Sequence, residues 1–587
     1  MRLRKAAIMP ALVAVSALTL TACGGGSSSS SGDAKKATAE VANFGLGTAA
    51  DSQGPVKGAA GAKKGGTAYD IEPAGFDYLD PSQQYVNTYQ VVGSLYSRQL
   101  TGYKTDPATG KVILVGDMAT DTGTQSDGGK TWTWTLKKGL KFEDGTPITS
   151  KDVKYAVERL YSPYQTQGAT YFQTWLSGAD YRKVYAGPDA GELPDSVIAT
   201  PDAQTIVFHF QAPHADAPYA AQMPNITAIE RSKDDKEKYN NHPVSIGPYK
   251  IKSYEPDKSL VFERNPEWDP STDPIRAANV DSWSFELGID QALLTQRLMA
   301  GSGNDKDAVT IAANADNASI KTIQSDAQYA SRTINQYEPY VDVFNINTTR
   351  VTDVNVRKAL AVAFPTATVQ KLLGGSATGD VAGNLMSPTV GGWQNTDPLG
   401  VKATPNGDPV KAKAMLTAAG KVGYTIVLAY SNTTRWQTTT AAIADQLNAA
   451  GFNVQRKELD PTSYYTQIGK PDNGFDLYRS GWGADWPVGS TVVPPTLDGR
   501  TIGDGAPNYS HYNSATSNAE MDRINKITDV KEQAAEWMKL SDTILANDVP
   551  MIPTTYDKYF QVYGAGLGGV AYNPVLGAVD LSNIFIK

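Results

Sequence analysis

The sequence predicts an α/β protein, because segments with the period of a strand and segments with the period of a helix alternate along most of its 587 residues. Alternating apolar residues at 131–136 and 206–210 are typical of half-buried strands. Capping residues precede apolar residues at helical spacing at 149–160 and 408–420. No short repeat is detectable, so we expect packed layers of helix and sheet rather than a solenoid.

The first of these elements are a strand, a helix and a second strand. Residues 131–136 read TWTWTL, which places both tryptophans on one face of a strand. Thr149 predicts a helix N-cap, and Asp152, three residues later, fits the partner position of a capping box. Residues 206–210 alternate again, so His209 would face outward from its strand.

Later in the chain the same design is repeated. The pair Asp408-Pro409 predicts a helix start with proline at its first position, and Gly420 would end that helix. Residues 424–430 are typical of a strand, and residues 438–451 have helical spacing of their apolar side chains. The order helix, strand, helix supports the α/β class.

The composition excludes several classes of protein. A single cysteine cannot form a disulfide within its own chain. With 41% hydrophobic and 9% aromatic residues, the chain can build large cores and is not disordered overall. Asp and Glu number 61 against 53 Lys and Arg, a net charge of −8, which disfavours a nucleic-acid partner.

Residues 1–22 are typical of an export signal rather than part of the fold. Three basic side chains lie within the first five residues, and residues 6–20 carry no charge. This stretch is shorter than the roughly 20 residues that a membrane-spanning helix needs. The run Leu20-Thr21-Ala22-Cys23 resembles the lipobox of bacterial lipoproteins, in which the cysteine becomes the lipidated N-terminus. The alternative is an ordinary signal peptide followed by a buried cysteine. We expect Cys23 to anchor the chain to the outer face of the cell membrane.

Residues 23–65 are rich in Gly, Ser, Ala and Lys and hold few large apolar side chains. A segment of this composition cannot repay the entropy of ordering it. We therefore expect a flexible tether that holds the body of the protein away from the lipid surface.

Motifs of catalysis and metal binding are sparse. The four histidines form no HExxH pattern, no GxSxG elbow occurs, and no second cysteine is available for a zinc cluster. Residues 564–569 match GxGxxG, but only 18 residues follow, too few for a dinucleotide-binding unit. We expect no enzyme, no catalytic residue, no cofactor and no bound metal. An extracytoplasmic hydrolase is the alternative, because the spacing of a catalytic carboxylate pair is spatial.

Several short motifs follow one another in order along the mature chain, and the longest, residues 129–153, reads GKTWTWTLKKGLKFEDGTPITSKDV. Others are found at residues 75–81, 247–250, 263–266, 345–347, 356–360, 408–412, 475–477, 481–485 and 548–553. In this order the chain resembles the family 5 bacterial extracellular solute-binding proteins, the oligopeptide- and dipeptide-binding receptors of ABC importers. One motif alone would be weak evidence, whereas six or more in order are specific.

The resemblance implies a two-lobed fold of the periplasmic-binding-protein type II class, with an extra subdomain in the first lobe (cluster C type). By that analogy the first lobe takes residues 66–335 and the returning segment 546–587. The subdomain would lie near 108–226, and the second lobe would take 336–545. Two crossings between the lobes suit hinge closure around a ligand.

The resemblance also implies ligand-binding residues. Asp485 stands where an aspartate of peptide-binding relatives pairs with the free α-amino group of the ligand, and a buried ammonium does need a charged acceptor. A surface aspartate is the alternative, and the run WPVG after it departs from the acid-proline continuation common in peptide binders. Trp482 and Trp486 would cover side chains of the solute or else belong to the core. Arg435, at a helix start, could meet a carboxylate.

Together these features predict a lipid-anchored extracytoplasmic receptor. It would capture a short peptide or similar small solute as a monomer and deliver it to ABC permease subunits, without a nucleic-acid partner. The alternatives are a receptor for a non-peptide solute, such as a metal complex or a sugar, and a sensory lipoprotein that binds a signal without import.

Overall fold

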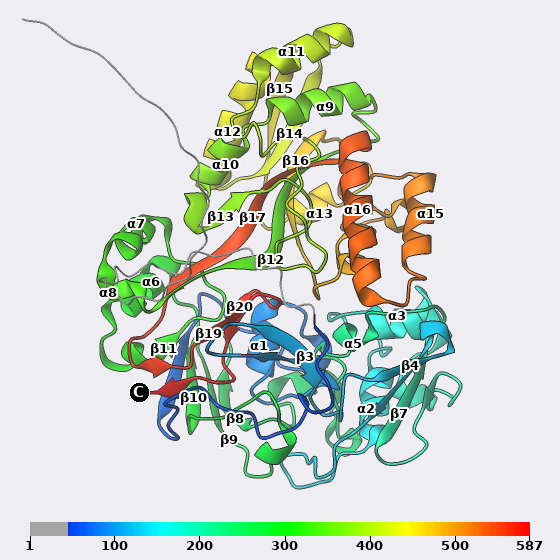
Figure 1. Ribbon diagram of the computed structural model, residues 1–587, viewed down its shortest axis with the longest axis vertical. Helices are drawn as coiled ribbons and strands as arrows, with labels where there is room; N and C mark the ends of the chain where they lie inside the picture. The colour runs from blue at the N-terminus through cyan, green and yellow to red at the C-terminus, as the bar shows by residue number, and fades with distance from the viewer. Residues whose placement is uncertain (1–44) are drawn as a thin grey trace, which may run out of the picture.

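Two lobes joined by two long strands make up the computed structural model, which describes residues 45–587 (Figure 1). The strands, β12 Thr333–Ile346 and β17 Met551–Val562, pair antiparallel along their length. In Figure 1 they run from the first lobe, at the bottom, into the sheet of the second lobe, at the top. The predicted α/β class and two-lobed arrangement are confirmed.

The first lobe is built on a five-stranded sheet in the order β11-β1-β10-β9-β8. β1 pairs parallel with β10 and β11, and the other neighbours are antiparallel. Trp283 and Phe285 of β10 point into the core, because apolar and polar residues alternate along this strand. The elements are β1 Thr67–Ile71, β8 Tyr249–Glu255, β9 Ser259–Arg264, β10 Ser282–Glu286, β11 Ala308–Val309, α1 Asn87–Gly93, α6 Gln291–Ala300, α7 Asn317–Ser325 and α8 Ala327–Ala330.

The extra subdomain has an antiparallel sheet in the order β4-β5-β7-β6. β5 confirms the predicted strand, and its two tryptophans are buried. α2 confirms the predicted capping box, in which Asp152 Oδ2 accepts from Thr149 N at 2.7 Å. His209 lies on the more exposed face of β7, as predicted. The elements are β2 Thr101–Thr105, β3 Val112–Gly116, β4 Thr124–Ser126, β5 Thr131–Thr135, β6 Ile198–Ala199, β7 Thr205–His209, α2 Ser150–Arg159, α3 Tyr171–Ser177, α4 Tyr181–Val184 and α5 Ala217–Ala220.

The second lobe contains a six-stranded sheet in the order β13-β17-β12-β16-β14-β15, with helices around it. Asp408 caps α11 by accepting from Lys411 N at 2.8 Å, as the sequence predicts. The predicted helix at 438–451 is α12, which begins four residues earlier because Thr433 is its N-cap. The elements are β13 Gly379–Val381, β14 Thr425–Ser431, β15 Asn453–Leu459, β16 Leu477–Gly483, α9 Val354–Ala363, α10 Thr366–Leu372, α11 Pro409–Ala418, α12 Thr434–Ala449, α13 Tyr464–Ile468, α14 Val493–Leu497, α15 Ala515–Ile524 and α16 Val530–Asp548.

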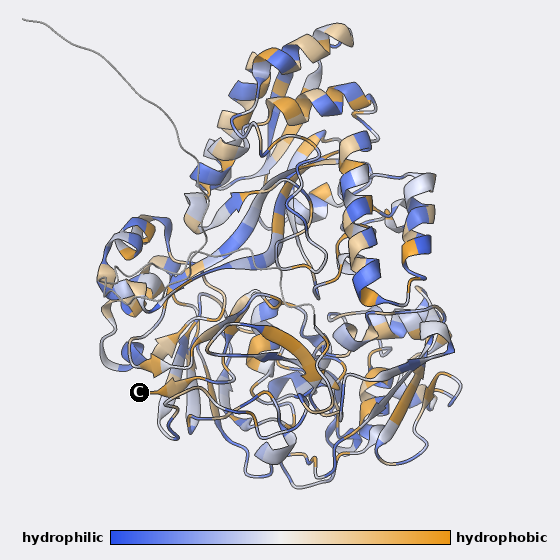
Figure 2. Cartoon of the chain, in the orientation of Figure 1, coloured by the Kyte–Doolittle hydropathy of each residue, from blue (hydrophilic) through white to orange (hydrophobic). Residues whose placement is uncertain are grey.

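Hydropathy follows this layering. β3 is apolar throughout in Figure 2, and it packs with the subdomain core through Val112 and Leu114. α16 shows both hydrophobic and hydrophilic residues in the same figure, and its buried side includes Trp537 and Leu545. α16 therefore covers the core with one face and meets water with the other.

After β17 the chain finishes in the first lobe with two short strand pairs, β18 Leu567–Gly568 with β21 Phe585–Ile586 and β19 Ala571–Asn573 with β20 Ala578–Asp580. We propose the lobe division 66–335 with 546–587, and 336–545, because β12 and β17 carry the chain between the two sheets. A subdomain start near 108 would cut the hairpin β2–β3. We therefore propose a start near residue 100.

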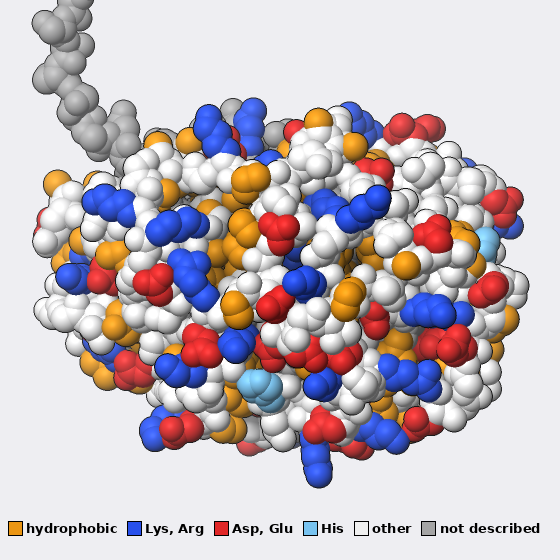
Figure 3. Space-filling view, turned by 90° about the horizontal axis from the view of Figure 1, so that it is seen from below, with side chains coloured by type: hydrophobic (Ala, Val, Ile, Leu, Met, Phe, Trp, Pro, Cys, Tyr) orange, Lys and Arg blue, Asp and Glu red, His pale blue; other side chains and the backbone are white. Residues whose placement is uncertain are grey.

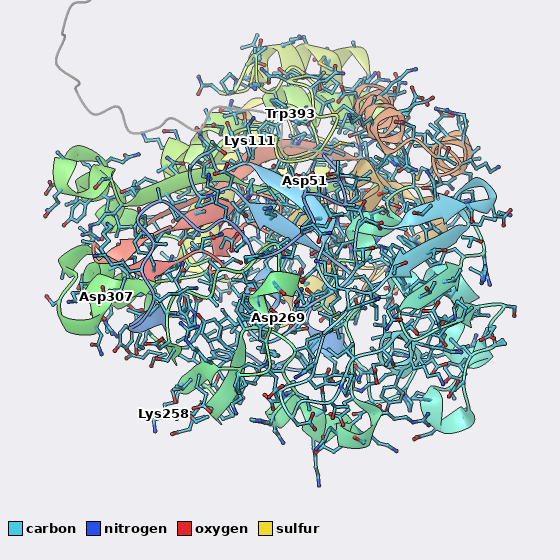
Figure 4. The ribbon with its side chains drawn as sticks, turned by 60° about the horizontal axis from the view of Figure 1, so that its bottom comes forward. Asp51, Lys111, Lys258, Asp269, Asp307 and Trp393 are labelled. Atoms are coloured by element: carbon cyan, nitrogen blue, oxygen red, sulfur yellow. The ribbon has the colours of Figure 1, made fainter. Side chains whose placement is uncertain are left out.

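Residues 45–65, the described part of the expected tether, lie against the first lobe and the subdomain. Gly47 N donates to a carbonyl of β3 at 2.7 Å, and Val56 N donates to Asp273 O at 3.1 Å. Figure 4 shows Asp51, on this segment, close to the same hairpin. The expectation of a flexible tether is therefore wrong for residues 45–65. Hydrogen bonds to the body offset the entropy cost of ordering this segment, which its own few apolar side chains could not offset.

The predicted signal peptide at 1–22, the lipidated Cys23 and the rest of the expected tether lie outside the described residues. Within residues 45–587, no helix is long and apolar enough to cross a membrane.

Candidate functional site

Asp485 lies between the lobes, in the loop that follows β16 of the second lobe. Its Oδ2 accepts a hydrogen bond of 2.9 Å from Tyr85 Oη, just before α1 of the first lobe. Tyr171 Oη, at the start of α3 in the subdomain, donates to the same oxygen. One carboxylate of the second lobe thus joins two separate segments of the first.

Within residues 45–587 the charge of Asp485 has no cationic partner. Among the described residues, no Lys, Arg or His forms an ion pair with it, and its Oδ1 accepts no hydrogen bond. Burial raises the pKa of Asp485 to about 6, against the two tyrosine hydrogen bonds, which lower it. At neutral pH the carboxylate is therefore mainly ionised, and an ammonium group would supply its missing counter-charge.

Trp486 packs at the lobe interface beside Asp485. Only 1% of its surface is exposed, and its ring centroid is 4.4 Å from that of Tyr171. Its Nε1 donates to Asp216 Oδ2 of the subdomain at 3.1 Å, and Ser490 Oγ donates to the same oxygen at 2.6 Å. This placement favours the core alternative for Trp486, because a side chain so deeply buried leaves little surface for a solute.

Trp482 lies inside the second lobe and is only half-buried. Its Nε1 donates to Thr491 O at 2.6 Å, and its ring lines a cavity of about 20 Å³. That volume suits about one water molecule. The cavity beside Trp482 is therefore too small for a peptide side chain.

Arg435 is exposed in the first turn of α12. It lines a cavity of about 330 Å³ between the lobes, whose walls include Gln291 and Asn314 of the first lobe. Glu338 of β12 and Arg479 of β16 line the same cavity. Arg435 has no ion-pair or hydrogen-bond partner for its guanidinium among residues 45–587 and could still meet a carboxylate.

The structure thus brings Asp485 and Trp486 together but places Trp482 and Arg435 at two separate cavities, neither of which Asp485 lines. Sequence reasoning missed Tyr85, Tyr171 and the acids of the larger cavity. No local motif marks these tyrosines, which lie 400 and 314 residues from their partner aspartate.

The described residues carry few other signs of chemistry. They contain no cluster of three or more His, Cys, Asp or Glu side chains that could hold a metal ion. The face shown in Figure 3 intersperses acidic and basic side chains, so this face offers no extended cationic surface for phosphate binding.

Comparisons with known proteins agree with this geometry. The chain is 24% identical over 522 residues to the probable D,D-dipeptide-binding periplasmic protein DdpA of Escherichia coli, covering 87% of this chain and 92% of that protein. It is 23% identical over 476 residues to the periplasmic oligopeptide-binding protein OppA of Salmonella typhimurium, covering 78% and 81%.

The structure is similar to the solved structure of clavulanic acid biosynthesis oligopeptide binding protein 2. The TM-score is 0.82 at 29% identity, and the match covers 91% of this chain and 100% of the other. Residues 114–504, more than half of the chain, match the model of bacterial extracellular solute-binding proteins, family 5 Middle. The chain therefore belongs to the family 5 bacterial extracellular solute-binding proteins.

Proposed function

We propose that this protein is the extracytoplasmic substrate-binding component of an ABC importer and captures short peptides between its two lobes. The observation that carries the proposal is Asp485, an ionised carboxylate held between the lobes without a cation. The names of the relatives, which include dipeptide- and oligopeptide-binding proteins, support the choice of a peptide.

Asp485 would hold the free α-amino group of the peptide. Its Oδ1 is available for a charge-assisted hydrogen bond, while Tyr85 and Tyr171 keep Oδ2 in place. Trp486 would exclude water from this contact because it closes the interface behind Tyr171. Arg435, in the neighbouring cavity, would face a carboxylate of the ligand.

Closure of the lobes would couple binding to delivery. β12 and β17 are the two connections that would bend, and a ligand that touches both lobes only in the closed state stabilises that state. The permease would then distinguish the closed, loaded protein from the open one. The bound solute would leave unchanged, because the proposal includes no covalent step.

Cys23 would carry the lipid that keeps the protein at the outer face of the cell membrane, after removal of residues 1–22. The body would act as a monomer, since one chain supplies both lobes of the site.

Native mass spectrometry of the purified mature protein tests the proposal. We expect bound peptides of mixed sequence and restricted length, released intact after denaturation. A single non-peptide mass, or peptides that are cleaved during incubation, would contradict the proposal.

A further inference from the structure

The larger interlobe cavity has the size of a ligand site. Its volume is about 330 Å³, within the roughly 300–1,000 Å³ usual for small-molecule pockets. Gln291 and Asn314 of the first lobe form one wall, and Trp436 of α12 belongs to the opposite one. A ligand here would touch both lobes.

An irregularity in the strand pairing brings two carboxylates into this cavity. On β12 the pairing with β17 shifts between Tyr337 and Val341, which lie opposite Lys558 and Tyr556. Three residues, 338–340, therefore stand opposite the single residue Asp557. Such a bulge changes the direction of side chains, and bulges are frequent beside binding sites.

The bulge is held in place by the second lobe. Ser387 Oγ donates to the backbone carbonyl of Glu338 at 2.5 Å, so the position of this residue is fixed by a contact outside the strands. Glu338 and Asp557 thus line the cavity from neighbouring strands, together with Asp342 four residues further along β12.

The negative charges of these three carboxylates are not equally balanced by cationic partners. Asp342 forms an ion pair with Arg479. Asp557 Oδ1 accepts only a neutral hydrogen bond, from Thr555 Oγ1 at 3.0 Å. The Glu338 carboxylate has neither an ion pair nor a hydrogen bond among the described residues. With every acid ionised, these three carboxylates exceed the two guanidinium groups of the lining, Arg435 and Arg479, by one charge.

One polar atom of the lining also lacks a hydrogen-bond partner among the described residues. Arg479 Nε is buried and has no acceptor among residues 45–587. The guanidinium lies 5.0 Å from the ring centre of Trp436, which restricts how far it can move to find one. Within the described residues, this donor is therefore left without an acceptor.

Tyr340 connects this cavity with Asp485. It pairs with Gly483 across the strands, two residues before Asp485. Burial raises the pKa of the Tyr340 phenol, and the charges of Glu338, Asp485 and Asp557 raise it further. Asp485 and the acids of the cavity are therefore near enough to the same phenol that each raises its pKa.

We propose that Glu338 and Asp557 form a subsite for a cationic side chain, a guanidinium or an ammonium, so that the protein prefers short peptides containing a basic residue. This inference rests on the proposed peptide-binding function and adds the class of side chain that the ligand carries. Once ionised, two acids that form no ion pair among the described residues favour a cation over a neutral side chain of the same shape.

Proton linkage gives an independent signature. Burial, with the nearby charge of Asp342, raises the pKa of Glu338 to about 8, so much of this group is protonated in the empty site at pH 7. Asp557 and the phenols of Tyr340, Tyr559 and Tyr572 are the other titratable groups that face it. A bound cation favours the ionised form, so binding should release protons and tighten as the pH rises.

Isothermal titration calorimetry with matched tripeptides tests the subsite. The probes have arginine at position one, two or three, with alanine elsewhere, and each is compared with its citrulline isostere. We expect the wild type to bind the best arginine probe on the order of tenfold to a hundredfold more tightly than its isostere. Titrations in buffers of different ionisation enthalpy should show more proton release with the arginine probe than with its citrulline isostere.

Variants assign the preference to its residues. Glu338→Gln and Asp557→Asn should bring the arginine-to-citrulline ratio close to one and leave the affinity for the citrulline probe nearly unchanged. Asp472→Asn, an exposed acid of the second lobe, is the matched control and should keep the wild-type ratio. A ratio that survives both cavity variants would overturn the assignment.

The outcomes separate the inference from the proposed function. Equal binding of arginine and citrulline tripeptides would refute the cationic subsite and leave peptide binding intact. If no tripeptide binds but free arginine binds more tightly than free citrulline, the subsite stands and the peptide function fails. If none of these probes binds, both are refuted.

Discussion

Replacing Asp485 by asparagine removes one charge between the lobes and little else. Asparagine has nearly the same shape, and its carbonyl oxygen can still accept from Tyr85 or Tyr171. The lobes should therefore still meet at this point. What is lost is the counter-charge for the ammonium group of a peptide.

The size of the loss follows from the contact that it removes. A hydrogen bond to a charged group contributes about 1.5–3 kcal/mol, and each 1.4 kcal/mol is about tenfold in affinity. We therefore expect Asp485→Asn to weaken peptide binding by about ten- to a hundredfold. An N-acetylated peptide has no α-ammonium and should bind the wild type and the variant with nearly equal affinity.

The pH dependence provides a second measurement. Because burial raises the pKa of Asp485 to about 6, wild-type affinity should fall as the pH is lowered through 6, and the variant should lack this step. The raised pKa also means that the folded protein holds this proton more tightly than the unfolded chain. The stabilisation of the fold by this proton is fully present below pH 3.8, the pKa of Asp485 in the unfolded chain, and is lost as the pH rises through 6. The melting temperature of the variant, relative to wild type, should therefore be higher at pH 7.5 than at pH 4.

Calorimetry measures the affinities of a free and an N-acetylated tripeptide, and thermal melts measure the stability of the unliganded proteins. Together they test the role assigned to Asp485. Equal affinity of wild type and Asp485→Asn for the free peptide would refute the assigned role. A melting temperature lowered by many degrees at pH 7.5 would show instead that the carboxylate mainly supports the fold.

Three further predictions concern the core, the interface and the anchor. Asp70 is fully buried beside Glu72, and its burial and the charge of Glu72 raise its pKa well above 3.8. Protonated Asp70 therefore stabilises the fold at low pH, and this stabilisation is lost as the pH rises. Asp70→Asn should raise the melting temperature at pH 8 more than at pH 4, and an equal shift at both would contradict this. Asp216→Asn weakens the contact with Trp486 and should shift the unliganded protein towards a larger radius of gyration in X-ray scattering, whereas an unchanged radius would show that the contact does not hold the lobes. Cys23→Ser should abolish metabolic labelling with a palmitate analogue and release the protein from membranes, and persistent labelling would exclude this anchor.

Local features of the fold could be predicted from the sequence because their partners are close in the chain. The capping box joins Thr149 to Asp152, three positions later, and the alternation in β5 shows directly which side chains are buried. Each depends on geometry that a few neighbouring residues determine. The two lobes could be predicted only because the order of the motifs resembles that of a known family.

The site could be predicted only in part, because its contacts join distant segments. Asp485 can be predicted from a family motif, but its tyrosine partners lie in a loop and at a helix start without a sequence pattern of their own. Residues 45–65 were misjudged for the same reason. Their composition predicts flexibility, and the hydrogen bonds that order them come from the first lobe and the subdomain.

Three acids at the lobe interface should differ in how their loss depends on the ligand, and this pattern tests the arrangement as a whole. Asp216 joins the subdomain to Trp486 and Ser490 of the second lobe and acts on closure, so its loss should weaken all ligands by one common factor, the change in the closed fraction. Asp485 should affect only ligands with a free α-amino group, and Glu338 only those with a basic side chain. A common factor for all three variants would mean that each acts through closure alone, and the separate contacts proposed for the ligand would be wrong.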